Sequence, residues 1–223
     1  MVTGQPHLSL RVDGSRPLSA GTVTEFGAVC DTIEDGDTSG PVIIYVSGVP
    51  GPECTSGLSV AVVSKWERAL RRLERLPAGT IAVAEGDCGG PALDALLASD
   101  YRIMPDWARL IVPVVDGATW PGMALYRLAR QAAGAAQARR AALFGAPIWA
   151  AEARAMGVID DVADDVTICA KKAMELAAAA GGAELAIRRQ LVLEAATTTF
   201  EDALGTHLAA CDRALRRAAA GSA

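Results

Sequence analysis

Aromatic side chains and lysines are both scarce in this chain of 223 residues. Phenylalanine, tryptophan and tyrosine together make up 4% of it, and 3 of its 21 basic residues are lysines. A surface for single-stranded nucleic acid stacks bases on exposed aromatic side chains within a basic groove, and this chain, with a formal charge of −5, has neither feature. We therefore expect no nucleic-acid partner.

Long hydrophobic runs and paired cysteine motifs are absent as well. No 18 consecutive apolar residues occur, and the first residues lack the basic segment and apolar run of a secretory signal. The five cysteines are an odd number without C-x-x-C spacing, which is typical of reduced thiols. These features predict a cytoplasmic protein with no membrane association and no metal site.

Small and aliphatic residues dominate what remains. Hydrophobic residues make up 51% of the chain, and alanine alone supplies about a fifth. A chain of this length buries about 70% of the surface that it exposes when unfolded, so it has ample material for a core. The length also fits one domain. We expect a single folded domain with a core of short aliphatic side chains.

Strand and helix patterns alternate along the first half. Apolar residues alternate or run continuously where strands are expected, and they recur at helical spacing in a helix of about 15 residues after Ser19. Strands are predicted at residues 7–12, 41–46, 80–84, 101–104 and 110–115, a loop at 47–57, and helices at 58–76 and from Pro91 to about Ser99. After Pro121 the chain is expected to be almost wholly helical. This order predicts an α/β fold.

A glycine-rich segment at residues 85–90 separates a predicted buried strand from the helix that Pro91 begins. Glycines at such a turn let a ligand approach backbone N–H groups at the positive end of the helix dipole. Such groups can stabilise an oxyanion. The same pattern also fits a tight turn that binds nothing.

Asp94 lies about one turn into this helix and is the best candidate for proton transfer. Apolar neighbours such as Leu93 and Leu97 would raise the pKa of its carboxyl toward neutrality. It could equally be an acidic residue that the helix dipole favours. Neither histidine lies near a plausible nucleophile. Four arginines between residues 68 and 75 indicate a solvated helix face or, less simply, a phosphate site.

Several segments together resemble the enoyl-CoA hydratase/isomerase (crotonase) family. Residues 144–162 resemble the family stretch L-T-G-x-P-I-x-A-x-E-A-x-x-x-G-L-V-x-x-V, and residues 121–128 resemble P-G-x-G-G-T-x-R-L. Residues 85–102 resemble N-G-x-x-x-G-G-G-x-E-L-A-L-A-C-D-x-R, with Gly86, Gly90, Asp94, Ala98, Asp100 and Arg102 on family positions. The resemblance covers nearly the whole chain.

This resemblance implies a particular architecture. It implies a spiral of ββα turns in residues 1–131 and a helical C-terminal region in residues 132–223, which builds homotrimers or hexamers. Both parts belong to one crotonase-like domain, 1–223. The implied substrate is an acyl-CoA thioester, so coenzyme A enters as part of the substrate and no other cofactor is needed.

The resemblance also implies an oxyanion hole of two backbone N–H groups. The first donor would be Ser56. The second family position falls on Pro91, which has no N–H, so Gly90 would have to donate instead. Gly57, Cys88 and Gly89 would contact the substrate.

The family's two acidic residues are altered in this chain. The first falls on Asp94, which is one methylene shorter than glutamate, and the second falls on Val114. Asp116 could replace the second only if the following loop were two residues tighter. Hydration of an enoyl-CoA needs two acid/base groups to position water, so an ordinary hydratase activity is in doubt.

A narrower resemblance concerns the hydratase-like companions of type III polyketide synthases in 3,5-dihydroxyphenylglycine biosynthesis. It is carried by residues 56–60, 65–68, 86–94 and 119–123. It implies dehydration or aromatisation of a cyclised intermediate toward 3,5-dihydroxyphenylacetyl-CoA, with the synthase and related crotonase-like proteins as partners. Two alternatives are a non-catalytic partner of the synthase and a generic enoyl-CoA hydratase/isomerase.

Overall fold

A mostly parallel sheet organises the chain, and the computed structural model describes it over residues 7–36 and 40–221. The strands are β1 (Leu8–Asp13), β2 (Val42–Gly48), β3 (Thr80–Gly89), β4 (Tyr101–Pro105), β5 (Arg109–Ile111), β6 (Val114–Val115), β7 (Ala118–Thr119), β8 (Ile148–Trp149) and β9 (Asp161–Ala163). The helices are α1 (Ala20–Glu34), α2 (Val60–Leu73), α3 (Gly90–Leu97), α4 (Met123–Gln131), α5 (Ala135–Phe144), α6 (Ala150–Ala155), α7 (Val166–Ala178), α8 (Ala183–Ala195) and α9 (Phe200–Gly221).

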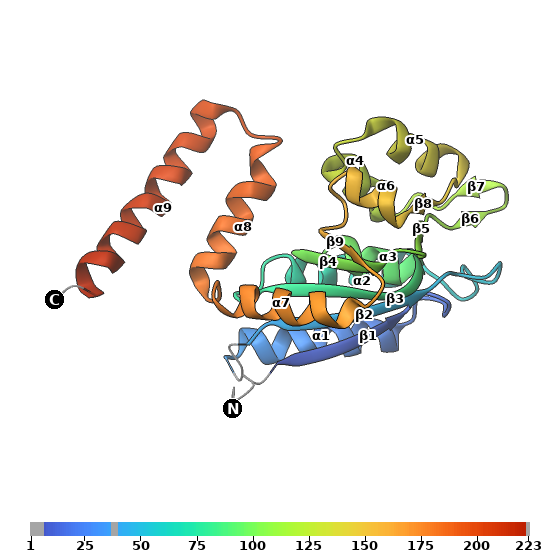
Figure 1. Ribbon diagram of the computed structural model, residues 1–223, viewed down its shortest axis with the longest axis horizontal. Coiled ribbons are helices and arrows are strands. Elements are labelled where there is room, and N and C mark those ends of the chain that lie inside the picture. The colour runs from blue at the N-terminus through green and yellow to red at the C-terminus, as the bar shows by residue number, and fades with distance from the viewer. Residues whose placement is uncertain (1–6, 37–39, 222–223) are drawn as a thin grey trace.

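The main sheet has the strand order β1-β2-β3-β4-β9, with every neighbouring pair parallel. Strand β5 pairs with the end of β3 and, in the antiparallel sense, with β8. Strands β6 and β7 form a separate hairpin. Figure 1 shows this sheet in the lower half of the body, with α4, α5 and α6 above it.

Side chains on the two faces of the sheet form two separate hydrophobic cores. Val42, Ile44 and Val46 of β2 pack into the larger core with α1, α2 and α3, whereas Ile43 packs into a smaller core with α7. Successive residues of a strand point to opposite faces. Because helices cover both faces, these strands are continuously apolar.

Helix α1 begins directly after Ser19, as predicted, and α2 begins at Val60, two residues after the predicted start. The side chains of Ser19 and Ser59 accept hydrogen bonds from the N–H groups of Thr22 and Val62, which caps the two helices. Further along, Arg72 of α2 forms ion pairs with two acidic residues of α1, Asp31 and Glu34. Arg72 thus joins two helices.

Strand β3 corrects the prediction of a turn at residues 85–90. It runs for 10 residues, through Gly89, because Cys88 pairs with Gly48 of β2 on one side and with Leu110 of β5 on the other. The change from strand to helix therefore occurs at Gly90. A second correction concerns the region after Pro121, where β8 and β9 interrupt the helices and join the main sheet.

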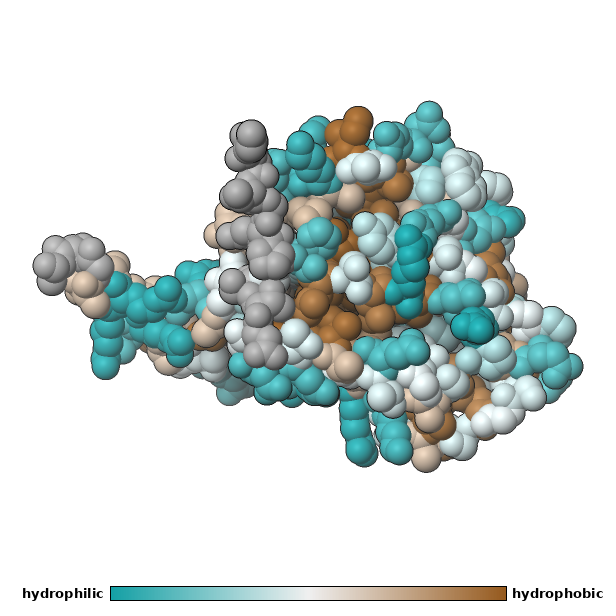
Figure 2. All heavy atoms as spheres, turned by 90° about the horizontal axis from the view of Figure 1, so that it is seen from below, coloured by the Kyte–Doolittle hydropathy of each residue, from teal (hydrophilic) through white to brown (hydrophobic). Residues whose placement is uncertain are grey.

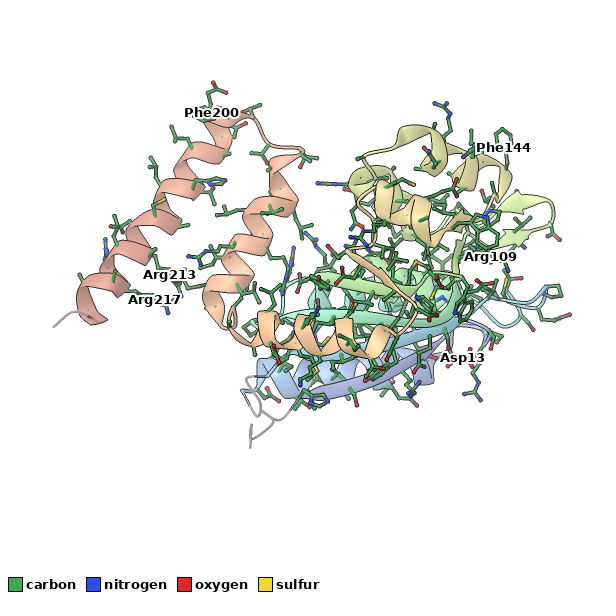
Figure 3. The ribbon with its side chains drawn as sticks, in the orientation of Figure 1. Asp13, Arg109, Phe144, Phe200, Arg213 and Arg217 are labelled. Carbon is green, nitrogen blue, oxygen red and sulfur yellow. The ribbon has the colours of Figure 1, made fainter. Side chains whose placement is uncertain are left out.

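Helices α8 and α9 form an arm that extends away from the body (Figure 1). Arg189 anchors α8: its guanidinium donates to both carboxylate oxygens of Asp100, each at 2.6 Å, and to the carbonyl oxygens of Leu76 and Ala78. On α9, Arg213 and Arg217 form ion pairs with one residue of α8, Glu184 (Figure 3).

Candidate active site

A cavity of about 60 Å³ lies against the N-terminal turn of α3. Its wall is formed by α2, α3 and the start of α4, together with the segment between β1 and α1, the loop that follows β2, and the segment between β5 and α4. Most of the lining is apolar or backbone, including Leu58, Trp120 and Ala124. Three charged residues, Arg16, Glu67 and Asp94, also line it among the described residues.

Asp94 is held in this wall by a buried tryptophan. The indole Nε1–H of Trp66 donates to Asp94 Oδ2 at 3.0 Å, and Trp66 itself is 1% exposed. Trp66 is fixed in turn by an edge-to-face contact with Phe26 of α1, whose ring centroid lies 4.9 Å away. The carboxylate oxygen therefore has a fixed position relative to the cavity.

Burial raises the pKa of Asp94 to about 7, and the negative charge of Glu67 adds to this effect. The hydrogen bond from Trp66 and the charge of Arg127 oppose it. A carboxyl with this pKa exchanges its proton readily near neutral pH. The raised pKa expected from the sequence is thus present, while the use of Asp94 in a reaction stays a prediction.

Glu67 shares a buried arginine with Glu74. Arg127 Nη1 lies 3.0 Å from Glu67 Oε2, and Arg127 Nε lies 3.0 Å from Glu74 Oε1. The arginine side chain is 7% exposed. Burial raises the pKa of Glu67, and the facing guanidinium of Arg127 opposes that rise. Sequence reasoning assigned no role to these residues, although Glu67 and Glu74 lie seven apart on one helix face.

The backbone at the start of α3 comes close to the loop that follows β2. Gly90 has φ +51°, in the left-handed region that favours glycine. A Cβ on Gly90 would lie 2.5 Å from Pro50 Cγ, and one on Gly89 would lie 2.9 Å from Pro50 Cδ. Only glycines allow this approach. Gly90 and Pro91 line the cavity, and Gly89 caps the helix beside them.

Ser56 and Gly57, the other predicted backbone positions, lie in an exposed turn. The N–H of Ser56 donates to the carbonyl oxygen of Glu53 at 2.9 Å. Of this loop, Cys54 and Thr55 line the cavity instead. The structure therefore brings Asp94 and Gly90 together and leaves Ser56 engaged elsewhere.

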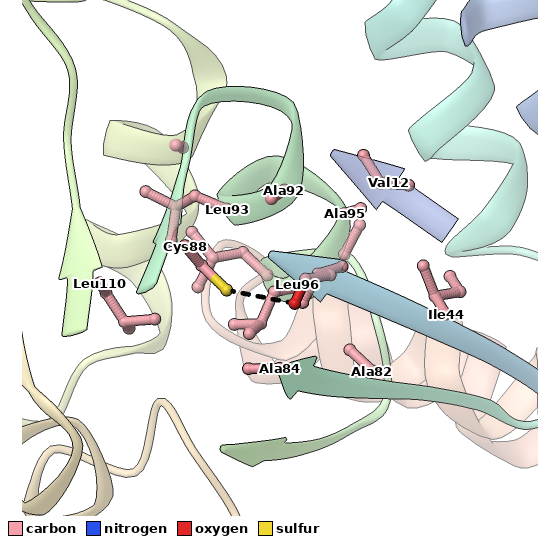
Figure 4. Close-up of a cluster of buried hydrophobic side chains, with 14 of the residues drawn as sticks. Val12, Ile44, Ala82, Ala84, Cys88, Ala92, Leu93, Ala95, Leu96 and Leu110 are labelled. Atoms are coloured by element: carbon pink, nitrogen blue, oxygen red, sulfur yellow. Dashed lines mark hydrogen bonds between the residues drawn. The ribbon is translucent and has the colours of Figure 1, made fainter. Parts of the chain in front are cut away.

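Cys88, predicted to contact substrate, has its side chain in the larger core. The thiol is fully buried and lies 3.4 Å from the carbonyl oxygen of Gly86, and it also faces the carbonyl oxygen of Val46 (Figure 4). Burial raises the pKa of this thiol to about 12. Cys88 is not among the residues that line the cavity.

The position of the second family acid lies on the β6–β7 hairpin. Val114 is 50% exposed, and Asp116, at the turn, has φ +50° and is exposed. Neither residue lines the cavity, whereas Val112 and Pro113 do. The alternative that Asp116 supplies a second acid requires a tighter loop than the structure has.

Two motif residues, Asp100 and Arg102, are structural. Asp100 accepts hydrogen bonds from the N–H and hydroxyl of Thr80, both at 2.9 Å, and pairs with Arg189. Half-buried Arg102 donates to the carbonyl oxygens of Leu97, Ser99 and Val158. These residues join β4 to the end of α3 and to the segment before β9.

Residues 7–36 and 40–221 contain neither a membrane-spanning helix nor a cluster of metal-binding side chains. No helix in these ranges is long and apolar enough to cross a membrane. No group of three histidine, cysteine, aspartate or glutamate side chains there could hold a metal ion.

Comparison with known proteins gives a consistent result. Residues 16–219 match the family described as Enoyl-CoA hydratase/isomerase. A protein of Amycolatopsis orientalis named Enoyl-CoA-hydratase is 56% identical over 212 residues, which cover 95% of this chain and 97% of that protein. A second relative, an enoyl-CoA isomerase/hydratase of Mycosarcoma maydis, is 33% identical over 48% of this chain and 39% of its own length.

Solved structures agree on the fold. An enoyl-CoA hydratase/isomerase from Marinobacter aquaeolei superimposes with a TM-score of 0.80 at 18% identity, covering 96% of this chain and 89% of that one. An enoyl-CoA hydratase from Polaromonas gives a TM-score of 0.79 at 19% identity, covering 98% and 92%. These matches confirm the predicted α/β, crotonase-like fold.

Proposed function

The chain belongs to the enoyl-CoA hydratase/isomerase family, and we propose that it acts on an acyl-CoA thioester with Asp94 as its proton-transfer group. The observation that carries this proposal is a carboxyl with a pKa of about 7, fixed by Trp66 in a cavity that also exposes the backbone of Gly90. Coenzyme A is part of the substrate, and the reaction needs no other cofactor.

The proposed reaction is the loss of a β-hydroxyl group. The Asp94 carboxylate takes the proton from Cα of the thioester, and the resulting enolate oxygen accepts a hydrogen bond from Gly90 N–H. The electron pair then forms the C=C bond as the C–O bond breaks. The departing hydroxyl takes the proton from Asp94 and leaves as water, so that the carboxylate is restored. Ser56 could add a second hydrogen bond if its turn opened.

We further propose that the substrate is polyketide-derived. In this proposal the protein assists a type III polyketide synthase by dehydration and aromatisation toward 3,5-dihydroxyphenylacetyl-CoA. The altered acids support it: Asp94 is shortened, Val114 replaces the second acid and Pro91 lacks an N–H. Loss of water from a ring about to become aromatic is strongly downhill, so a reduced catalytic site would suffice.

The first prediction tests Asp94. We expect Asp94→Asn to form the product at least about 100-fold more slowly in a reaction with the synthase, because a positioned acid/base group contributes a factor of about 10²–10⁴. The amide can still accept the hydrogen bond from Trp66, so the fold is expected to persist. Product formation is followed by chromatography of the CoA esters. An unchanged rate with folded Asp94→Ala would contradict the proposal.

The two alternatives give different results in the same assays. A non-catalytic partner of the synthase is favoured by Pro91 and Val114, and it would be supported by full stimulation with Asp94→Ala and by co-purification with the synthase. A generic enoyl-CoA hydratase, the name of the relative from Amycolatopsis orientalis, would consume crotonyl-CoA, which a fall in absorbance detects.

We also propose that the protein forms homotrimers or hexamers. Large apolar side chains are exposed on several C-terminal helices of the described chain, among them Phe144, Ile168, Leu176, Val192 and Phe200. The face seen from below shows apolar side chains gathered between hydrophilic ones (Figure 2). Patches of this kind mark association surfaces.

A further inference from the structure

One carboxylate of the cavity has no role in the reaction described above. Among the described residues that line the cavity, Glu67 and Asp94 are the two acids. Glu67 follows Trp66 on α2, so the two carboxylates come from different helices that meet at the Trp66–Asp94 hydrogen bond. Val112 and Pro113, the lining residues next to the family position of the second acid at Val114, are not acidic.

We propose that Glu67 is the second carboxylate of the active site, the base that accepts the Cα proton while Asp94 protonates the leaving hydroxyl. This inference rests on the proposed function and refines the single-acid reaction. Its geometric basis is that Glu67 lines the cavity and is held there by buried Arg127 at 3.0 Å.

The environments of the two acids fit this division of roles. Burial raises the pKa of both carboxyls, but Glu67 forms an ion pair with the Arg127 guanidinium, whereas Asp94 accepts a hydrogen bond from the neutral indole of Trp66. A pair of carboxyls whose surroundings separate their protonation states can act as base and acid in one step. The Glu67 charge also raises the pKa of Asp94, which keeps a proton on Asp94 near neutral pH.

Glu67 can release the proton that it gains, because it also lines a second opening. Glu67 gains the Cα proton as the C–H bond breaks, the electron pair forms the C=C bond, and the C–O bond breaks as the hydroxyl takes the Asp94 proton to become water. Glu67 also lines a groove of about 1170 Å³ beside α2, α4 and α8. Of the residues that the structure describes, it is the one that lines both the cavity and this groove. Glu67 can return its proton to water in the groove while substrate fills the cavity, and Asp94 regains a proton from water before the next turnover.

Glu74 offers a matched control for a purely structural role of Glu67. It pairs with the same arginine at the same 3.0 Å distance, but it lines the groove and not the cavity. If Glu67 only balanced the charge of Arg127, Glu67→Gln and Glu74→Gln would have similar effects. If Glu67 takes the proton, only Glu67→Gln removes the base.

The experiment measures kcat and KM against pH for the wild type, Glu67→Gln, Glu67→Asp and Glu74→Gln with the same thioester. We expect Glu67→Gln to lower kcat by about 100-fold or more with little change in KM, and to remove the acidic limb of the pH profile. Glu67→Asp should restore part of the rate. Glu74→Gln should stay within about threefold of the wild type, because it removes no reacting group.

The possible failures are distinguishable. Equal rates for Glu67→Gln and Glu74→Gln, with both proteins folded by circular dichroism, would overturn the role of Glu67 and leave the proposed function in place. A folded wild-type protein that turns over no thioester, alone or with the synthase, would overturn the proposed function and this inference together.

Discussion

The raised pKa of Asp94 affects the stability of the protein as well as its proposed activity. The pKa of the Asp94 carboxyl is about 7 in the folded protein and about 4 in an unfolded chain. Between these pH values the folded state binds more protons than the unfolded state, so the Asp94 contribution to the free energy of unfolding falls as pH rises from about 4 to about 7. Above pH 7 the buried charge destabilises the fold.

Asp94→Asn should therefore stabilise the protein at alkaline pH. An amide is neutral at every pH and can still accept the hydrogen bond from Trp66. We expect the free energy of unfolding to rise by about 2 kcal/mol at pH 8 and to change little at pH 4. Urea denaturation of the wild type and of Asp94→Asn at pH 8 and pH 4 measures this difference in the free energy of unfolding.

Asp13 is a control, because the pKa of its carboxyl is lowered where that of Asp94 is raised (Figure 3). Hydrogen bonds from Ser15 lower the pKa of its carboxyl. Its contribution to stability is present above the ordinary carboxyl pKa and is lost as pH falls through the lowered value. Asp13→Asn should therefore destabilise the protein at pH 8. If Asp94→Asn lowered stability at pH 8 as well, the buried charge of Asp94 would not be the cause.

Residues close in sequence could be predicted to share the site, and residues from other elements could not. Gly90 and Asp94 belong to one strand-to-helix pattern, which local spacing reveals. Trp66 lies 28 residues before Asp94, and no local pattern shows that its indole reaches the carboxylate. The positions of Glu67 and Arg127 likewise depend on how α2 packs against α4.

At the scale of elements, hydrophobic patterns identified most of the sheet and the first two helices. The exceptions have two causes. Residues 85–89 read as a turn because glycine and aspartate are poor strand formers, yet pairing with β2 and β5 holds them extended. Strands β8 and β9 have two and three residues, too few for periodicity to detect.

Helix α8 is held to the body of the protein through Arg189. Arg189 is the buried link between α8 and the sheet, with four hydrogen bonds to Asp100, Leu76 and Ala78. Removing Arg189 leaves the Asp100 carboxylate without its ion pair, and the carbonyl oxygens of Leu76 and Ala78 without their hydrogen bonds from the guanidinium. We expect Arg189→Ala to lower the free energy of unfolding by about 3 kcal/mol in urea denaturation.

The neighbouring Arg188 is the control for Arg189. Its side chain is 61% exposed and pairs with Glu184 four residues earlier. Arg188→Ala should change stability by no more than about 0.5 kcal/mol. Equal effects of the two substitutions would mean that α8 is not held through Arg189.

At the scale of the whole molecule, α9 has two contrasting sides. Phe200, Leu204, Leu208 and Leu215 follow helical spacing and are 44–73% exposed. Arg213 and Arg217, which pair with Glu184 of α8, lie on the opposite side of the helix, because each residue turns the helix by about 100°. The apolar stripe therefore faces away from α8, where a second copy of the chain could cover it.

The last prediction tests this stripe through the mass of the assembly. We expect the wild type to sediment at three or six times the 23.0 kDa of one chain. Leu208→Glu should weaken association by about tenfold or more for each interface, because burying a leucine contributes about 1.5–3 kcal/mol and a buried charge adds a cost. Ala209→Glu places the same charge one residue along, off the stripe, and should leave the assembly intact. Sedimentation velocity over a range of concentrations measures both. A monomeric wild type, or equal dissociation by the two variants, would show that the stripe does not hold copies of the chain together.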